Sequence, residues 1–169
     1  MEEYAYVLDL KISDNNLVYL IGEKYYTLLT ALVKKNAKIK IGDRVYIGGV
    51  LEKRDVIEKI KYRISYGDLT EGAKLNLKDV LKIMISNNQQ PFINFLNNAK
   101  LVNPRIHQLD FLPHIGSKSR ELIISNRPYS SFEDFKNKTK LDPLEIFSEK
   151  LVREISDRDL VKFFVISKI

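Results

Sequence analysis

Residues 4–22 read Tyr-Ala-Tyr-Val-Leu-Asp-Leu-Lys-Ile-Ser-Asp-Asn-Asn-Leu-Val-Tyr-Leu-Ile-Gly, and this stretch decides the class of the N-terminal fold. Large side chains alternate with other residues as far as Leu10, which is typical of a strand with one buried face. Turn-forming residues follow at Asp14, Asn15 and Asn16, and a second apolar run from residue 17 to 21 ends at Gly22. The stretch therefore predicts two strands joined by a turn.

The same kind of pattern continues to about residue 66. Alternation recurs in residues 38–41 and 56–66, with a turn signal at Gly42-Asp43 and a break at Gly48-Gly49. Residues 25–33 are ambiguous, because their composition suits a strand and their apolar spacing suits a helix. About five short strands in one such segment favour a small closed barrel, and the OB-fold is the leading template. We expect residues 1–68 to form this OB-fold-like domain.

The rest of the chain is dominated by a helical period. Leu77, Val80, Leu81 and Met84 follow the 3.6-residue rhythm, and Pro91 suits the first turn of a second helix. We expect connecting helices in residues 69–100 and a helical domain in residues 101–169, whose last apolar run, residues 160–166, forms a terminal strand. The sequence thus predicts an α+β protein.

Residues 109–120, Leu-Asp-Phe-Leu-Pro-His-Ile-Gly-Ser-Lys-Ser-Arg, resemble a helix-hairpin-helix motif. In such a motif the free N–H groups and the positive dipole end of the second helix can bind a backbone phosphate. His114 replaces the usual first glycine, and we expect it to adopt a positive φ; Arg120 stands where a small residue is usual. The alternative is an ordinary helix-turn-helix corner without a ligand. The candidate phosphate-binding residues are His114, Gly116, Ser117, Lys118 and Arg120.

The net charge of +6 and the isoelectric point near 9.3 point modestly toward anionic partners. The excess lies in residues 34–63, which hold ten Lys and Arg against four Asp and Glu. This segment is either a solvated face or a surface that follows phosphates. The candidate cations are Lys53, Arg54, Lys59, Lys61 and Arg63. The candidate tyrosines for stacking on bases are Tyr46, Tyr62 and Tyr66.

Several classes of protein are disfavoured. Cysteine is absent and only two histidines occur, so we expect no disulfide, no metal site and no cofactor. No phosphate-binding glycine loop, dinucleotide fingerprint or serine elbow is present, and we expect no catalytic residue. No apolar run approaches the ~20 residues of a membrane span, and the acidic start is unlike a signal peptide. These features favour a cytoplasmic, non-catalytic protein that does not bind membranes.

Strings along the whole chain, taken in order, resemble the archaeal DUF655 family. They are Glu-Tyr-Ala-Tyr-Val-Leu-Asp from residue 3, Tyr-Tyr-Thr-Leu-Leu from 25, Gly-Asp-Arg-Val-Tyr-Ile-Gly from 42, Arg-Ile-Ser-Tyr-Gly-Asp-Leu-Thr from 63, Phe-Leu-Asn-Asn-Ala from 95, and the hairpin Leu-Pro-His-Ile-Gly from 112. Members usually carry Pro-Gly at the hairpin, so His114 departs from the pattern.

The resemblance implies an OB-fold-like domain, a helix-hairpin-helix region and nucleic-acid binding, in a setting of translation or rRNA maturation. It implies no catalytic residue. Our leading hypothesis is therefore an RNA-binding protein. The alternatives are a protein–protein adaptor on the ribosome or the transcription machinery, and a DNA-binding protein.

Overall fold

The computed structural model describes residues 1–11 and 16–166. The chain divides into a strand-rich unit, Met1–Met84 with Val152–Ile169, and a helical unit, Ile85–Leu151. This division differs from the expected segments 1–68, 69–100 and 101–169. Most of the first helix and the segment after residue 151 group with the strands.

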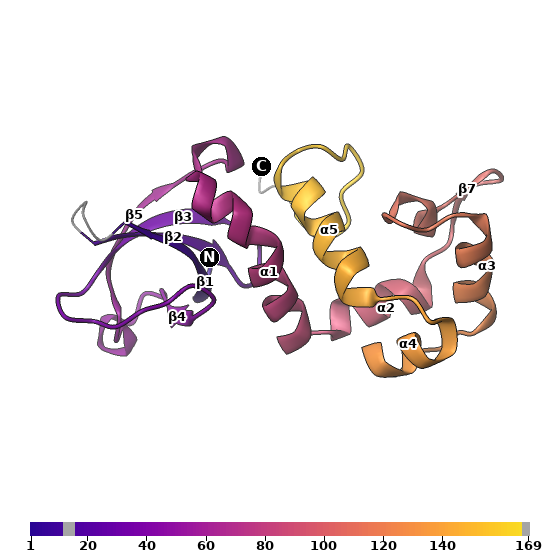
Figure 1. The fold of residues 1–169 in the computed structure, drawn as a ribbon, viewed down its shortest axis with the longest axis horizontal. Helices are drawn as coiled ribbons and strands as arrows, with labels where there is room; N and C mark the ends of the chain where they lie inside the picture. Colours follow the sequence, from indigo (N-terminus) through magenta and orange to yellow (C-terminus); the bar gives the residue numbers. More distant parts are fainter. Residues whose placement is uncertain (12–15, 167–169) are drawn as a thin grey trace. The chain divides into compact units, whose positions relative to one another are not determined.

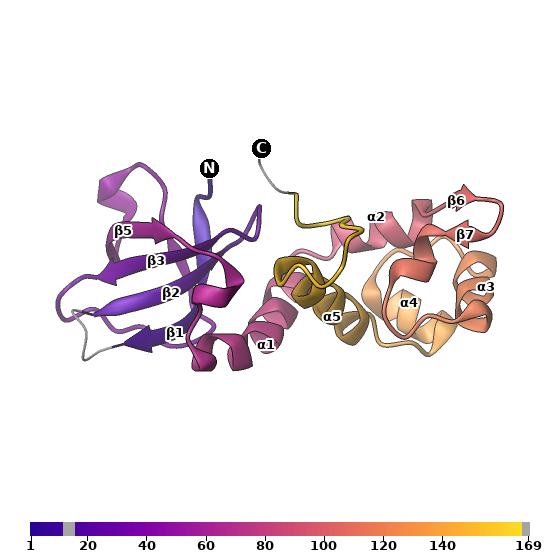
Figure 2. The ribbon, with the colours of Figure 1, turned by 90° about the horizontal axis from the view of Figure 1, so that it is seen from above.

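The strand-rich unit contains one antiparallel sheet in the order β4-β1-β2-β3-β5 (Figures 1 and 2). Its strands are β1 (Tyr4–Lys11), β2 (Leu17–Gly22), β3 (Leu28–Val33), β4 (Arg44–Tyr46) and β5 (Ile57–Arg63). The sheet curls around an apolar interior, but β4 and β5 do not pair with each other, so it is a half-barrel and not the expected closed barrel. The ambiguous residues 25–33 contribute a strand.

One predicted strand is absent, and part of one predicted turn lies outside the described residues. Residues 38–41 form no strand, which corrects that expectation: they enter a turn in which the Lys40 N–H donates to Asp43 Oδ2 at 2.9 Å. Ala37 and Ile39 pack against the half-barrel core from this loop, whereas Ile41 is 45% exposed. Asp14 and Asn15 of the predicted turn lie outside the described residues.

Register shifts change which side chains face the half-barrel core. In β1 the shift falls between Val7 and Asp9, so the inward residues are Ala5, Val7 and then Leu10. β5 carries two shifts against β3, and its inward residues Ile57 and Ile60 are three apart. A bulge adds one residue to one strand, which breaks the two-residue alternation beyond it.

Helix α1 (Glu71–Asn87) is anchored to β1 at its start. Thr70 Oγ1 accepts from the Ala73 N–H at 3.0 Å and donates to Asp9 Oδ2 at 2.5 Å. Asn76 Nδ2 donates to the Leu8 carbonyl at 3.0 Å. A Cβ atom on Gly72 would lie 2.7 Å from Asp9 Oδ2, so glycine permits this close approach. These contacts explain why most of α1 belongs to the strand-rich unit.

The segment after α5 (Pro143–Ile155) is held by a buried carboxylate. The N–H groups of Phe163, Phe164 and Val165 donate to Glu154 Oε1 at 3.0, 2.9 and 3.0 Å, and Glu154 is fully buried. Successive N–H groups of a strand point in opposite directions, whereas here three converge on one oxygen. The predicted terminal strand over residues 160–166 is therefore wrong.

The helical unit contains α2 (Gln90–Asn98), the two-stranded ribbon β6 (Leu101–Asn103) and β7 (Ile106–His107), the 3₁₀-helix η3 (Gln108–Phe111), α3 (Ser117–Ser125), α4 (Phe132–Thr139) and most of α5. Its core is aromatic: the Phe147 ring lies 5.0 Å from Phe92 and 6.1 Å from Phe132 between centroids. Local signals set the helix starts, because Ser131 caps α4 and Pro91 lies in the first turn of α2.

Candidate nucleic-acid interface

Strand β5 presents a row of cations at the edge of the sheet. Lys59, Lys61 and Arg63 are exposed, and Lys53 is exposed nearby in the 3₁₀-helix η1 (Leu51–Lys53) of the β4–β5 loop. None of the four forms an ion pair with another described residue. Asp55 and Glu58 lie in the same segment and offset part of this charge. We call Lys53, Lys59, Lys61, Tyr62 and Arg63 the basic edge.

Tyr62 is the most exposed of the three candidate stacking residues. Its side chain is 66% exposed, and Lys61 Nζ lies 5.7 Å from its ring centroid. The register shift between Ile60 and Tyr62 causes this exposure, because it turns Tyr62 away from the core into which Ile60 packs. An exposed ring beside a cation is suited to stacking on a base.

The other two tyrosines are engaged within the fold. Tyr46 is half-buried, with its ring edge-on to Tyr4 at 5.3 Å and its hydroxyl accepting from the Val50 N–H at 3.3 Å. Tyr66 is half-buried in the 3₁₀-helix η2 (Tyr66–Asp68), where Lys74 Nζ lies 5.4 Å from its ring. Neither offers a free face comparable to that of Tyr62.

A cleft of about 340 Å³ lies where the half-barrel fails to close. One wall carries Ile47 and Gly49, just beyond β4, and the other carries Ile60 and Arg63 of β5. Arg54 also lines the cleft, but its guanidinium donates to the carbonyls of Gly48 and Ile47 at 2.9 and 3.1 Å. Arg54 therefore organises the β4–β5 loop, in contrast to the unpaired cations of the basic edge.

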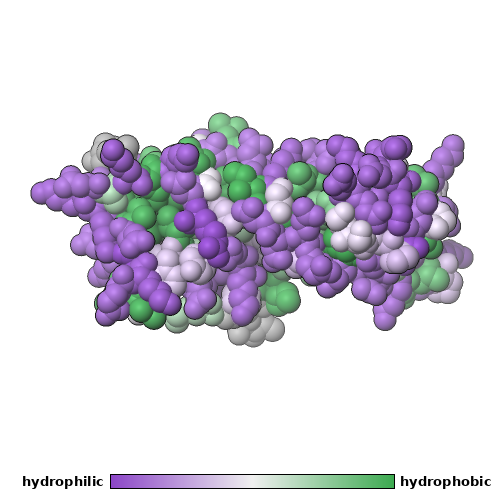
Figure 3. Space-filling view, turned by 90° about the horizontal axis from the view of Figure 1, so that it is seen from below, coloured by the Kyte–Doolittle hydropathy of each residue, from purple (hydrophilic) through white to green (hydrophobic). Residues whose placement is uncertain are grey.

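Apolar side chains also reach the surface of the strand-rich unit. Val50 and Leu51 of the β4–β5 loop are 46% and 65% exposed. Figure 3 shows hydrophobic residues emerging among hydrophilic ones on the face of this unit that it draws. The basic edge thus adjoins apolar surface within the same loop and strand.

The hairpin in the helical unit has the backbone that the sequence predicts at His114. Its φ is +65°, which confirms the expected positive-φ position, and the preceding Leu112 and Pro113 are buried. Gly116 is the N-cap of α3 with an extended backbone at φ −97°, and a Cβ atom there would meet nothing within 4 Å. The turn therefore does not require glycine at this position.

The start of α3 is open and carries no acidic residue in its first turn. Gly116, Ser117 and Lys118 are exposed, and Lys118 forms no ion pair with any residue in the described part of the chain. Arg120 is different: its Nη1 donates to both oxygens of Asp110 at 3.0 and 3.1 Å. Arg120 thus links α3 to η3, and its guanidinium is paired with the Asp110 carboxylate.

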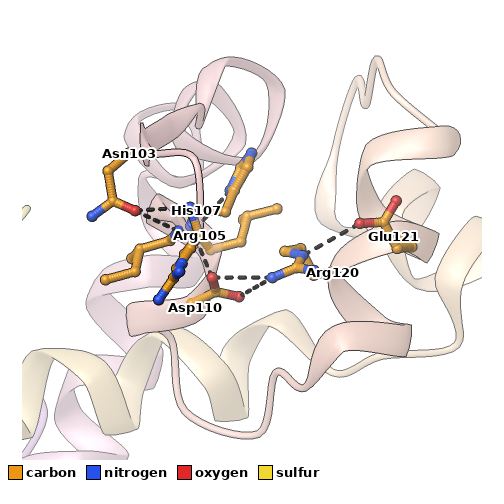
Figure 4. A network of polar contacts seen from close by, with 8 residues as sticks. Asn103, Arg105, His107, Asp110, Arg120 and Glu121 are labelled. Carbon is orange, nitrogen blue, oxygen red and sulfur yellow. Dashed lines mark hydrogen bonds and ion pairs between the residues drawn. The ribbon is translucent and has the colours of Figure 1, made fainter.

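Figure 4 shows the polar network that stabilises this hairpin. His107 and Asp110 form a capping box on η3, in which the His107 N–H donates to Asp110 Oδ2 at 2.8 Å and the Leu109 N–H donates to His107 Nδ1 at 3.0 Å. Burial, reinforced by Arg127, lowers the pKa of His107 and favours the neutral ring, whose Nδ1 can accept. His107 is a structural residue.

Asp110 makes this network sensitive to acid. Burial opposes ionisation of its carboxyl, but hydrogen bonds from the His107 N–H and Arg120 outweigh it and lower its pKa below 3.8. The stabilisation is present above that ordinary value and is lost as the pH falls through the lowered pKa. We expect Asp110→Asn to reduce the free energy of unfolding by about 1–2 kcal/mol at pH 7, as for loss of a helix cap, and by less at pH 3.

Urea unfolding at both pH values measures this difference. Asp55→Asn, at an exposed aspartate, is the matched control and should change the free energy by less than about 0.5 kcal/mol. An Asp110→Asn effect of equal size at pH 3 and pH 7 would contradict the assignment.

The fold also brings together three residues that sequence reasoning did not connect. His114 of the hairpin meets Glu145 and Glu149 of α5, with one ligand atom from each within 4.8 Å of the others. The i, i+4 spacing of the two glutamates was the available signal, since it places them on one helix face. The histidine comes from a segment distant in sequence, so no spacing could reveal it.

In the part of the chain that the structure describes, every helix is too short or too polar to span a bilayer. This finding agrees with the lack of a long apolar run in the sequence.

Comparison with known proteins gives a consistent result. Residues 1–167 match the family model described as "Protein of unknown function (DUF655)". The uncharacterized protein MJ0038 of the archaeon Methanocaldococcus jannaschii is 32% identical, over 99% of this chain and 80% of its own length. The crystal structure of Af1531 from the archaeon Archaeoglobus fulgidus, also matched by the DUF655 model, has a TM-score of 0.88 and 33% identity, over 98% of this chain and all of that one. The half-barrel and hairpin described above thus belong to a member of the DUF655 family, as the strings in its sequence indicate.

Proposed function

We propose that this protein binds RNA without catalysis, through the basic edge of the half-barrel and the hairpin of the helical unit. The basic edge is the observation that carries the proposal. It combines cations that form no ion pair with a described residue with the exposed ring of Tyr62. Cations along a groove with interleaved aromatic rings are how proteins bind single strands without strong sequence preference. A setting in translation or rRNA maturation rests on the family resemblance.

The topology supports an OB-fold assignment for the strand-rich unit. OB-folds are five-stranded, partly open Greek-key barrels, and the loop between their fourth and fifth strands commonly contacts nucleic acid. The order β4-β1-β2-β3-β5 leaves one open seam between β4 and β5, and the corresponding loop carries Lys53. In this assignment a single strand of RNA lies along β5, beside the cleft between β4 and β5.

A salt series tests this function. Neutralising three or four phosphates of a single strand should give a slope of about −2 to −3 in a plot of log affinity against log salt. A short single-stranded RNA, the matched DNA, a structured RNA and a duplex DNA are compared by fluorescence anisotropy. Tighter binding to RNA supports the proposal, and preference for duplex DNA would favour the DNA-binding alternative. Absence of binding to all four at low salt would contradict both.

A protein–protein adaptor is the second candidate, and the exposed apolar residues Val50 and Leu51 favour it. An apolar protein interface depends weakly on salt, because it releases few counterions. The same salt series therefore distinguishes the two candidates.

Lys118 tests the contribution of the hairpin. Glu at this position exchanges attraction for repulsion toward a phosphate at the start of α3, so we expect Lys118→Glu to weaken RNA binding by roughly 1–2 kcal/mol, about five- to thirtyfold. An acidic residue in the first turn stabilises a helix, so unfolding should not cause the loss. Lys136→Glu, at another exposed lysine of the same unit, is the matched control.

A substitution at Gly116 tests whether the turn before α3 needs glycine in order to fold. Because its backbone is extended and its surroundings are open, Gly116→Val should fold normally. If Lys118→Glu binds RNA as tightly as the parent, the hairpin is only a structural corner.

A further inference from the structure

The strongest feature that the proposed RNA binding does not use is the cluster of His114, at the hairpin, with Glu145 and Glu149 of α5. One potential ligand atom of each residue lies within 4.8 Å of the other two. His114 Nε2 and Glu149 Oε2 lie 2.5 Å apart. The residues come from two segments of the chain, so the cluster is a product of the tertiary fold.

The two glutamates lie at i, i+4 on α5, where like charges on one helix face repel each other. The helix tolerates Glu145 near its positive end, since α5 starts at Pro143. A cation between the two carboxylates would convert this repulsion into attraction. The imidazole supplies a third donor from another segment, on a turn anchored by the buried Leu112 and Pro113.

We propose that His114, Glu145 and Glu149 bind a divalent transition-metal ion. One imidazole nitrogen with two carboxylate oxygens is a set that suits Zn²⁺, Mn²⁺, Fe²⁺ or Co²⁺, whereas Mg²⁺ and Ca²⁺ prefer oxygen alone. The side chains of His114 and Glu149 are 56% and 25% exposed, which leaves coordination positions open to solvent. The site departs from our expectation of no metal site, which rested on the absence of cysteine and the presence of only two histidines.

The geometry needs a small adjustment to hold the ion. Ligand atoms about 2.0–2.2 Å from a metal lie roughly 3.0–3.4 Å from one another in tetrahedral or octahedral arrangements. The His114–Glu149 contact of 2.5 Å must therefore lengthen, and any separation near the 4.8 Å bound must shrink. Rotamer changes of the two half-buried glutamates can supply both movements.

This site does not depend on the proposed RNA binding. The basic edge consists of cations and needs no metal, so chelation should leave the salt-dependent binding of the strand-rich unit unchanged. The two proposals can therefore fail separately.

Zn²⁺ titration of the full chain, freed of purification tags and stripped with a chelator, tests the proposal by calorimetry. We expect one Zn²⁺ per chain. His114→Gly, which suits the positive φ, and Glu145→Gln and Glu149→Gln should each weaken binding by at least about tenfold, since even residues that only support a ligand contribute roughly 10–100-fold. Glu133→Gln, at an exposed glutamate of the same unit, should bind like the parent.

A measurement on the unaltered protein guards against variants that fail to fold. The chain has only two histidines, so the imidazole NMR signals of His114 and His107 can be distinguished. Zn²⁺ should shift or broaden the His114 signals and leave those of the buried His107 unchanged. Absence of saturable Zn²⁺ binding, equal affinity in the three ligand variants and the parent, or a response at His107 alone would overturn the proposal.

Discussion

Replacing Lys59, Lys61 and Arg63 together by glutamate is expected to weaken binding of single-stranded RNA by at least about a hundredfold. Each change removes a charge-assisted contact and adds repulsion, and a loss of about 1 kcal/mol or more at each position accumulates to roughly that factor. The slope of log affinity against log salt should flatten by about 2, since three phosphates are no longer neutralised. Anisotropy at several salt concentrations measures both quantities.

The variant should still fold, because all three side chains are exposed on an edge strand and form no ion pair with a described residue. Lys100, Arg105 and Lys136 are exposed in the helical unit, and changing them to glutamate alters the net charge equally. This control should retain most of the affinity. Equal losses in the two triple variants would show that overall charge, and not the basic edge, determines binding.

Glu154→Ala is expected to produce the largest loss of stability among these substitutions. One buried carboxylate oxygen accepts three backbone N–H groups, and each donor left unsatisfied costs about 1–3 kcal/mol. Water can reach part of the released segment, so we expect a decrease of about 3–5 kcal/mol in the free energy of unfolding. Glu154→Gln keeps an acceptor oxygen and should cost less.

Denaturant unfolding measures these changes, with Glu133→Ala, at an exposed glutamate, as the control. A second readout is Tyr26, whose pKa is raised to about 12 by burial and then by the negative charges of Glu154 and Glu2. Glu154→Gln removes one of these charges and should lower the Tyr26 pKa, as followed by NMR titration. Stability and Tyr26 titration that both match the parent would refute the role assigned to Glu154.

Interactions over three or four residues were readable from the sequence. Ser131 and Pro91 mark helix starts because a cap acts on the N–H groups of the next turn. The positive φ of His114 follows equally from its own turn. The clustering of Lys59, Lys61 and Arg63 is likewise a property of one short segment. The α+β class, the first two strands and the family followed from patterns of this kind.

Only the tertiary structure decided where partners distant in sequence meet. The bulges of β1 and β5 each depend on the neighbouring strand, and the bulge of β5 exposes Tyr62, which alternation within β5 could not show. Arg54 and Arg120 resemble the free cations in sequence, but carbonyls and a carboxylate of the folded chain already bind them. Residues 160–166 form no strand, because Glu154 binds backbone N–H groups of this segment. His114 lies beside α5 because the fold brings together two segments that are distant in sequence.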